Sequence, residues 1–213
     1  MINTMNKVSV IDYGAGNIGS VLNMLQHIGV SAEVITKPDQ VKKSEKIILP
    51  GVGNWDAGVQ RLQDSGLIDA LKNRVLNDKV PILGVCLGMH LFLNSSEEGI
   101  LPGLGWIDGT VKAFNFSGIN VTAKRLPSPH MGWNSVTVMH NSTLTQSLDE
   151  NSKFYFVHSF HVDVKDSENI MLQTDYGYPF TSGIRKENIY GVQFHPEKSH
   201  RHGMNLIKSF ASI

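Results

Sequence analysis

The chain has 213 residues, enough for one domain that buries roughly 70% of its unfolded surface. Its 19 basic and 19 acidic residues balance, so no excess charge favours nucleic acid or an anionic membrane as partner. The single cysteine excludes an internal disulfide, and an unpaired thiol fits a reducing, cytoplasmic compartment. Residues 1–7 are too short and polar for a signal peptide, and no apolar run approaches the ~18 residues that span a bilayer.

The first predicted strand, residues 8–11, leads into a glycine-rich loop, residues 14–19, and then an amphipathic helix. A Gly-x-Gly-x-x-Gly segment after a strand is the fingerprint of dinucleotide-binding folds. Against that function, Asp12 and Tyr13 put a carboxylate and a bulky ring where a pyrophosphate would approach. The next predicted strand, residues 32–36, has no clear acidic residue at its end. Cofactor binding is therefore a rival hypothesis that titration with a nicotinamide cofactor would test.

A third strand is predicted at residues 46–49, followed by a Pro-Gly-Val-Gly-Asn loop at residues 50–54. The two glycines around Val52 make the peptide planes there easy to rotate, so an N–H could turn toward an oxyanion. An ordinary strand-to-helix loop is the alternative interpretation. Residues 55–64 and 67–76 follow as predicted helices.

The only cysteine lies in the segment 80–93. Residues 80–85 predict a buried strand and residues 87–93 a helix, so Cys86 falls at the turn between them. The unpaired N–H groups and the positive dipole end of a helix favour a thiolate there. Gly84 and Gly88 let the two backbones approach closely, as in the Gly-x-Ser-x-Gly elbow that presents a nucleophile. A free cysteine packed as a small hydrophobe is the other interpretation.

This alternation of strands and helices predicts an α/β fold, with a mostly parallel central sheet and helices on both faces. The turn at Cys86 lies at the carboxyl ends of the strands, where such sheets bind ligands. Beyond residue 97, glycines and prolines separate short strand-like segments that predict added antiparallel strands. These segments are residues 110–114, 121–125 and 134–139. No linker or internal repeat is evident, so we expect a single domain over residues 1–213.

A further strand is predicted at residues 154–157, and His158 and His161 follow it. On one strand, this odd spacing sends the two rings to opposite faces, so they could not share an ion, and we expect no metal site. His130 carries no pattern of its own. The last helix is predicted at residues 203–211.

Near the end of the chain, a strand-like segment runs into His195, Pro196 and Glu197, and the proline ends it. His195 is a candidate base for Cys86, and Glu197 is placed to bind the second ring nitrogen and fix the tautomer. A His-x-Glu pair on the surface is the alternative. If the fold brings these residues together, they form a Cys, His, Glu constellation.

Residues 84–88 together with residues 195–197 resemble the triad, or class I, glutamine amidotransferases. Four more spans narrow the resemblance, nearly end to end, to the glutaminase subunits of imidazole glycerol phosphate synthases: 12–17, 49–53, 129–134 and 156–160. The resemblance implies a flavodoxin-like fold with added antiparallel strands. It also implies hydrolysis of glutamine to glutamate and ammonia through a cysteine thioester, without a cofactor.

The resemblance assigns roles to further residues, which share the surroundings of the proposed nucleophile. The oxyanion hole is assigned to Val52, Gly53 and Leu87, substrate contacts to Gly51, His90, Ser159 and Phe160, and a partner interface to Asn17. The family usually has a glutamine at the position of His90. Histidine can donate and accept one hydrogen bond each, but it is shorter and titrates near neutral pH.

The implied partner is a cyclase subunit that forms a heterodimer with this chain, receives the ammonia, and makes imidazole glycerol phosphate and aminoimidazole carboxamide ribotide in histidine biosynthesis. Two other hypotheses remain. Relatives of this subunit supply ammonia for amidination of sugars in surface polysaccharides. A non-catalytic scaffold with a vestigial elbow is the hypothesis of another class, and labelling of Cys86 by a glutamine-analogue electrophile separates it from an enzyme.

Overall fold

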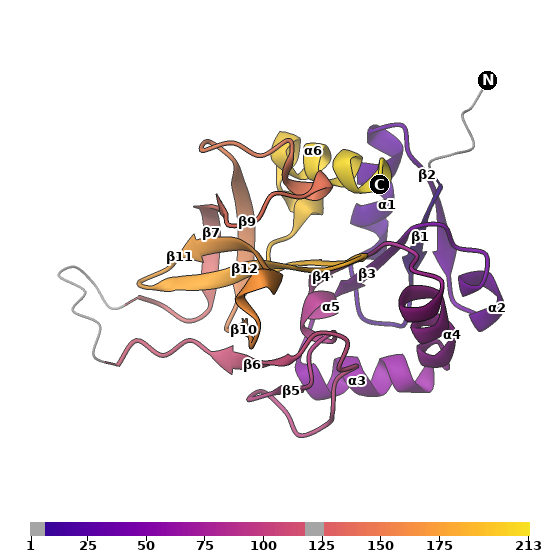
Figure 1. Cartoon of the computed structure of the whole chain (residues 1–213), viewed down its shortest axis with the longest axis horizontal. Coiled ribbons are helices and arrows are strands. Elements are labelled where there is room, and N and C mark those ends of the chain that lie inside the picture. Colours follow the sequence, from indigo (N-terminus) through magenta and orange to yellow (C-terminus); the bar gives the residue numbers. More distant parts are fainter. Residues whose placement is uncertain (1–6, 118–125) are drawn as a thin grey trace.

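The computed structural model describes residues 7–117 and 126–213 (Figure 1). The predicted strand at 121–125 lies outside these residues. Within them, parallel strands in the order β2-β1-β3-β4-β13 form the centre of the main sheet. Their bounds are β1 Lys7–Ile11, β2 Ser31–Ile35, β3 Ile47–Gly51, β4 Ile82–Cys86 and β13 Ile189–Val192. This is the flavodoxin-like strand order, and it confirms the predicted parallel core.

Antiparallel strands extend this sheet beyond β13, as the sequence predicts. The first is β12 (Pro179–Lys186), and the sheet continues through β10 (Phe160–Val164) and β6 (Gly109–Ala113); a short β5 (Ser95–Ser96) then pairs with β6 in parallel. Two further strands, β11 (Ile170–Asp175) and β8 (Thr137–Val138), branch from β12. A separate pair consists of β7 (His130–Ser135) and β9 (Lys153–His158). The predicted strand 134–139 is thus divided between β7 and β8.

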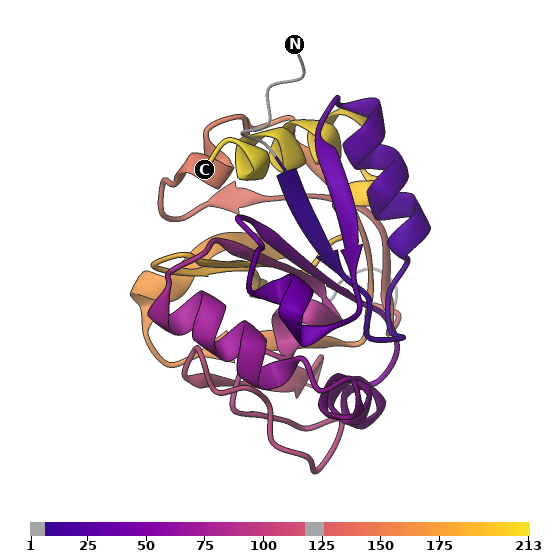
Figure 2. The same cartoon turned by 90° about the vertical axis from the view of Figure 1, so that its right-hand side faces the viewer.

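Helices cover both faces of the parallel strands (Figures 1 and 2). On one face lie α1 (Ile18–His27) and α6 (His200–Ala211). On the other lie α2 (Pro38–Val41), α3 (Trp55–Asp64) and α4 (Ile68–Lys72), which continues as a π-helical turn, Asn73–Asn77. The very short α5 spans Leu87–His90. Three 3₁₀ turns lie at Thr143–Thr145, Ser167–Asn169 and Pro196–Lys198.

The alternation of side chains along β3 explains this two-sided packing. Ile47 and Leu49 belong to the core cluster beneath α3 and α4, whereas Ile48 belongs to the cluster beneath α1 and α6. Successive strand residues point to opposite faces, so a strand that is apolar throughout must be covered on both sides. None of the helices in residues 7–117 and 126–213 is both long and apolar enough to cross a bilayer.

The helix after Cys86 is shorter than predicted. It ends at His90, although the apolar run that predicts it continues to residue 93. The carbonyls of Leu91 and Phe92 accept hydrogen bonds from the amides of Leu104 and Trp106 instead of from a following helical turn. Tertiary contacts therefore replace the intrahelical bonds that residues 91–93 would otherwise make.

Candidate active site

Cys86 lies on a strained turn at the carboxyl end of β4. Its backbone has φ 54° and ψ −114°, a conformation that is rare for a residue with a side chain. A Cβ atom added to Gly88 would lie 1.9 Å from the carbonyl oxygen of Leu49, and one added to Gly84 would lie 2.7 Å from that of Gly88. The predicted close approach of the backbones is confirmed, but Cys86 itself, not a glycine, takes the positive φ.

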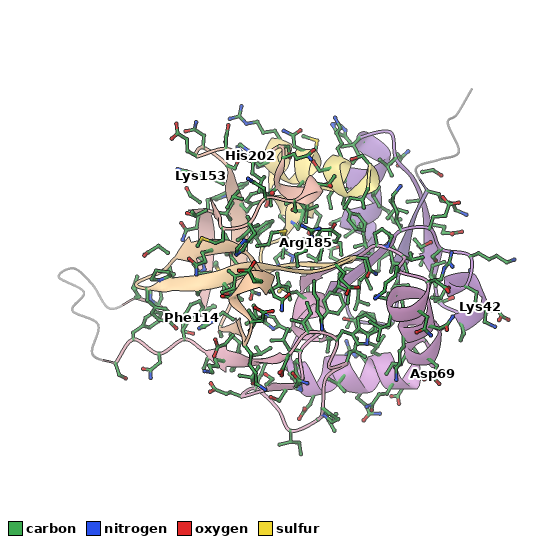
Figure 3. The ribbon with its side chains drawn as sticks, in the orientation of Figure 1. Lys42, Asp69, Phe114, Lys153, Arg185 and His202 are labelled. Carbon is green, nitrogen blue, oxygen red and sulfur yellow. The ribbon has the colours of Figure 1, made fainter. Side chains whose placement is uncertain are left out.

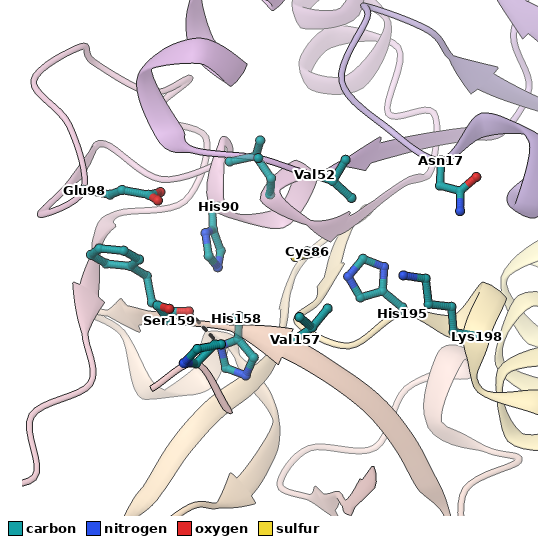
Figure 4. A pocket seen from close by; sticks show the side chains of 14 residues that line it. Asn17, Val52, Cys86, His90, Glu98, Val157, His158, Ser159, His195 and Lys198 are labelled. Carbon is teal, nitrogen blue, oxygen red and sulfur yellow. Dashed lines mark hydrogen bonds between the residues drawn. The ribbon is translucent and has the colours of Figure 1, made fainter. Parts of the chain in front are cut away.

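His195 lies beside Cys86 in the folded chain, although 109 positions separate them in the sequence (Figure 4). Its Nδ1 donates to Oε1 of Glu197 at 2.7 Å, so Nε2 is left to face the sulfur. The side chains of His195 and Glu197 are only 2% and 5% exposed. Burial lowers the pKa of His195, but hydrogen bonds and charge interactions with Cys86 and Glu197 outweigh it and raise the pKa to about 9.

The backbone of His195 is fixed by hydrogen bonds to a neighbouring strand. Its amide donates to the carbonyl of Tyr155 in β9, at 2.9 Å. The buried Ser199 hydroxyl donates to the carbonyl of His195 at 2.6 Å and accepts from the amide of Tyr155 at 3.0 Å. Ser199 thereby closes the turn that carries the imidazole, a role that no sequence motif indicated.

A cavity of about 590 Å³ opens above Cys86, at the carboxyl ends of β3, β4 and β13. This volume is typical of small-molecule sites. The cavity brings together most of the site residues predicted from the sequence, and Cys86 lies between His90 and His195 (Figure 4). The lining residues that the sequence predicted are Asn17, Val52, Gly53, Cys86, Leu87, His90, Ser159, Phe160 and His195. Those that it missed are Glu98, Pro129, Val157, His158 and Lys198.

The loop after β3 forms one wall of the cavity. Val52 is 41% exposed, and Gly53 has φ +109°, a conformation that favours glycine. The loop is anchored where Asn54 caps α3, because its Oδ1 accepts from the amide of Ala57 at 3.0 Å. Next to this loop, where Gly51 pairs with Cys86, the amides in the first turn of α5, starting with Leu87, have no intrahelical acceptors.

Gly51 and Asn17 have structural roles that the sequence did not indicate. Gly51 is buried and does not line the cavity; a Cβ atom there would lie 2.6 Å from the amide nitrogen of Gly88. It therefore serves the close packing of β3 against the turn at Cys86. Asn17 lines the cavity and is exposed, and its Oδ1 caps α1 by accepting from the amide of Ser20 at 3.4 Å. A partner contact by Asn17 is compatible with this exposure.

His90 does not titrate near neutral pH, contrary to the expectation from its residue type. Its side chain is buried, and this desolvation lowers its pKa to about 4. Its Nε2 lies 2.8 Å from Oε1 of Gln193, and Nε2 of Gln193 donates to Sγ of Cys86 at 3.8 Å. Gln193 is fully buried and was missed in the sequence.

The predicted His158 and His161 lie on two different strands, because the chain turns at Ser159. His158 Nδ1 lies 2.8 Å from the carbonyl oxygen of Phe160, and its Nε2 lies 3.0 Å from Nδ1 of His130. The carbonyl can only accept, so His158 donates from Nδ1 and must accept from His130 at Nε2. His130, for which the sequence predicted no role, thus makes a defined buried contact.

The rings of these histidines pack around Phe114, whose centroid is 5.2 Å from that of His158 and 5.0 Å from that of His161. Phe114 directly follows β6 and is labelled in Figure 3. Within the described parts of the chain, no group of three or more His, Cys, Asp or Glu side chains could hold a metal ion. At the start of the glycine-rich loop, residues 14–19, Arg61 donates to the carbonyl of Gly14 at 2.7 Å, and the ring of the preceding Tyr13 is buried.

Fold and cavity together define an α/β protein that presents a cysteine on a strand-to-helix turn beside a histidine–carboxylate pair. A family model described as "Glutamine amidotransferase class-I" matches residues 9–212. The chain therefore belongs to the class-I glutamine amidotransferase family, and it is an enzyme of that family.

Relatives with curated names match nearly the whole chain. It is 49% identical over 203 residues to "Imidazole glycerol phosphate synthase subunit HisH 2" of Methanococcus maripaludis, covering 95% of this chain and 98% of the relative. It is 44% identical to the protein of the same name from Pseudomonas aeruginosa, covering 97% and 99%.

Solved structures share the fold at low sequence identity. One is PurLQS from Thermotoga maritima, with a TM-score of 0.72, 17% identity, and 97% of each chain covered. Another is the glutaminase domain of CTPS from Trypanosoma brucei, with a TM-score of 0.66, 17% identity, and 97% and 94% covered. At these identities the similarity concerns the fold alone.

Proposed function

We propose that this chain is the glutaminase subunit of an imidazole glycerol phosphate synthase: it hydrolyses the side-chain amide of glutamine and supplies the ammonia to a cyclase partner in histidine biosynthesis. The observation that carries the proposal is the juxtaposition of Cys86 with the His195–Glu197 pair, in which Cys86 and His195 line one cavity. The names of its relatives support the pathway.

In the proposed reaction, the sulfur of Cys86 attacks the δ-carbonyl carbon of glutamine. The C–N bond then breaks, and the proton held by His195 goes to the departing nitrogen, which releases ammonia and leaves a γ-glutamyl thioester. Water attacks the thioester and gives a proton to His195, so that glutamate leaves and the thiolate–imidazolium pair is restored. Glu197 stabilises the ring in its protonated form, before the first proton transfer and again after the second.

The negative charge that develops on the carbonyl oxygen needs donors. The N–H groups of Val52 and Leu87 are the proposed oxyanion hole, because both residues line the cavity and follow the paired residues Gly51 and Cys86; Gly53 permits rotation of the loop. We assign His90, Ser159 and Phe160 to substrate binding because they line the remaining wall.

The proposed partner is a cyclase that forms a heterodimer with this chain, with Asn17 at or near the contact. Loss of one oxyanion donor costs about 10²–10³-fold in rate, so a reorientation of the Val52 peptide would be a sufficient off switch. We therefore expect the isolated chain to be nearly silent until the cyclase and its ligand bind.

The experiment is release of glutamate from glutamine, measured with this chain alone, with the cyclase, and with the cyclase plus its phosphorylated ribulosyl ligand. Strong stimulation by the partner, together with formation of imidazole glycerol phosphate, supports the proposal. Stimulation without that product would point to another acceptor, such as a sugar. Equal hydrolysis in all three mixtures would refute the coupling.

A further inference from the structure

Gln193 is fully buried directly behind two residues that line the cavity. Gln193 follows the last residue of β13, and its backbone amide donates to the carbonyl of Ser182 at 2.9 Å. It is not among the residues that line the cavity. Its side chain therefore does not touch a bound substrate. Both polar atoms of that side chain are nevertheless occupied, one by His90 and one by Cys86.

The direction of these two hydrogen bonds fixes the tautomer of His90. The side-chain nitrogen of Gln193 donates to Sγ of Cys86 at 3.8 Å, so the carbonyl oxygen of the same amide faces His90. A carbonyl oxygen only accepts, so Nε2 of His90 carries the hydrogen at this 2.8 Å contact. Burial holds the ring neutral, because it lowers the pKa of His90 to about 4.

A neutral imidazole with its hydrogen on Nε2 has a lone pair on Nδ1. This nitrogen makes no hydrogen bond to any other group in the described part of the chain, and His90 lines the cavity. The one polar function that His90 offers a substrate is therefore an acceptor. A carboxamide NH₂ can donate to it, whereas an ester oxygen cannot.

We propose that Gln193 is a positioning residue that holds His90 as the Nε2–H tautomer, so that Nδ1 selects the carboxamide NH₂ of the substrate, while the amide of Gln193 donates to the sulfur of Cys86. This inference rests on the proposed glutaminase function. His90 and Gln193 then act together to determine the preference of the site for glutamine.

The test compares two substrates, glutamine and the γ-methyl ester of glutamate, with the cyclase and its ligand present. Both can form the same γ-glutamyl thioester, but only glutamine carries an N–H for Nδ1. In the variant Gln193→Met, which keeps the length of the side chain but removes both hydrogen bonds, the preference for glutamine in kcat/KM should fall roughly 5- to 10-fold, mainly through a higher KM for glutamine.

Two further variants distinguish loss of the correctly oriented His90 side chain from a non-specific loss of activity. His90→Phe should narrow the preference as much as Gln193→Met, and the double variant should narrow it no further, because the two residues act through one hydrogen bond to the substrate. Gln193→Glu keeps an acceptor for His90 but places a second oxygen beside the sulfur. It should lower kcat for both substrates and keep the preference.

Thr174→Val is the matched control. It also removes a buried side-chain hydrogen bond, that from Thr174 to Ser182 at 2.8 Å, and Thr174 does not line the cavity. It should leave the preference unchanged. The inference is overturned if Gln193→Met lowers kcat/KM for both substrates by the same factor, so that the preference for glutamine stays unchanged as in the control. It is also overturned if the double variant narrows the preference by the combined effect of the two single variants. Absence of glutamate release by the unaltered complex would instead overturn the proposed function.

Discussion

Replacement of Glu197 by glutamine tests how the buried carboxylate activates His195. The pKa of His195 is raised from 6.5 to about 9, although burial alone would lower it. At about 1.4 kcal/mol per pH unit, this difference favours the protonated ring by roughly 3 kcal/mol. Cys86 and Glu197 share this effect. If Glu197 supplies about half, Glu197→Gln lowers the pKa of His195 by about one pH unit.

The protonated ring must donate to the departing ammonia, so activity falls as pH rises through the pKa of His195. The alkaline limb of kcat/KM should therefore lie near pH 9 in the unaltered chain and about one pH unit lower in Glu197→Gln. The same raised pKa contributes folding stability that is present below pH 6.5 and lost as pH rises through about 9. Over this pH range, the free energy of unfolding should therefore fall less in Glu197→Gln than in the unaltered chain.

The assay is glutamate release between pH 6 and 10 in the complex with the cyclase, with urea unfolding of each variant at pH 7 as control for folding. An alkaline limb that stays at the same pH, in a variant that remains folded, would show that Glu197 does not raise the pKa of His195. It would mean that Cys86 alone sets the protonation of His195.

Three other perturbations have defined outcomes. Gly88→Ala forces a Cβ atom to within 1.9 Å of the Leu49 carbonyl oxygen and should lower the free energy of unfolding by about 3 kcal/mol or more. Gly19→Ala is the control, because no atom lies within 4 Å of the added Cβ. Equal urea midpoints for the two variants would contradict the close packing at Gly88. Burial lowers the pKa values of His90 and His130 to about 4, so these residues add stability above pH 6.5 that is lost as pH falls through about 4. His130→Phe should therefore reduce the slope of the free energy of unfolding against pH in this range by the equivalent of about one proton. An unchanged slope would argue against a buried neutral His130. Ser199→Ala removes the hydroxyl that joins His195 to Tyr155 and should lower kcat about tenfold with little change in KM; an unchanged kcat would show that other contacts suffice to hold the imidazole.

Much of the parallel core could be predicted from the sequence because it follows local rules. The apolar runs give β1 to β4, and the spacing of glycines around Cys86 gives the strand-to-helix turn. The cavity could be anticipated because a parallel sheet puts the ends of β4 and β13 at the same edge.

What the sequence could not give depends on contacts between distant segments. The helix after Cys86 stops at His90 because residues 104–107 supply hydrogen bonds that no local pattern reveals. Gln193 reads as an ordinary polar residue near the end of a strand, and its importance follows only from the positions of His90 and Cys86.

The histidines illustrate the same limit. The prediction that His158 and His161 share one strand was wrong, because a turn at Ser159 separates β9 from β10. His130 has no neighbour in sequence that suggests a function, and its partner His158 is 28 residues away. Pairing of β7 with β9 makes that contact, and such long-range pairing cannot be deduced from side-chain periodicity.

The most direct test of the account is to map the site at which a diazo-ketone analogue of glutamine alkylates this chain in the presence of the cyclase and its ligand. If this cavity cleaves the amide, we expect one adduct, on the sulfur of Cys86, which excess glutamine suppresses. The adduct should be absent from Cys86→Ser and form much more slowly in His195→Ala. An adduct at another residue, or labelling of Cys86 that glutamine does not compete with, would contradict the assignment of this cavity as the place where the amide is cleaved.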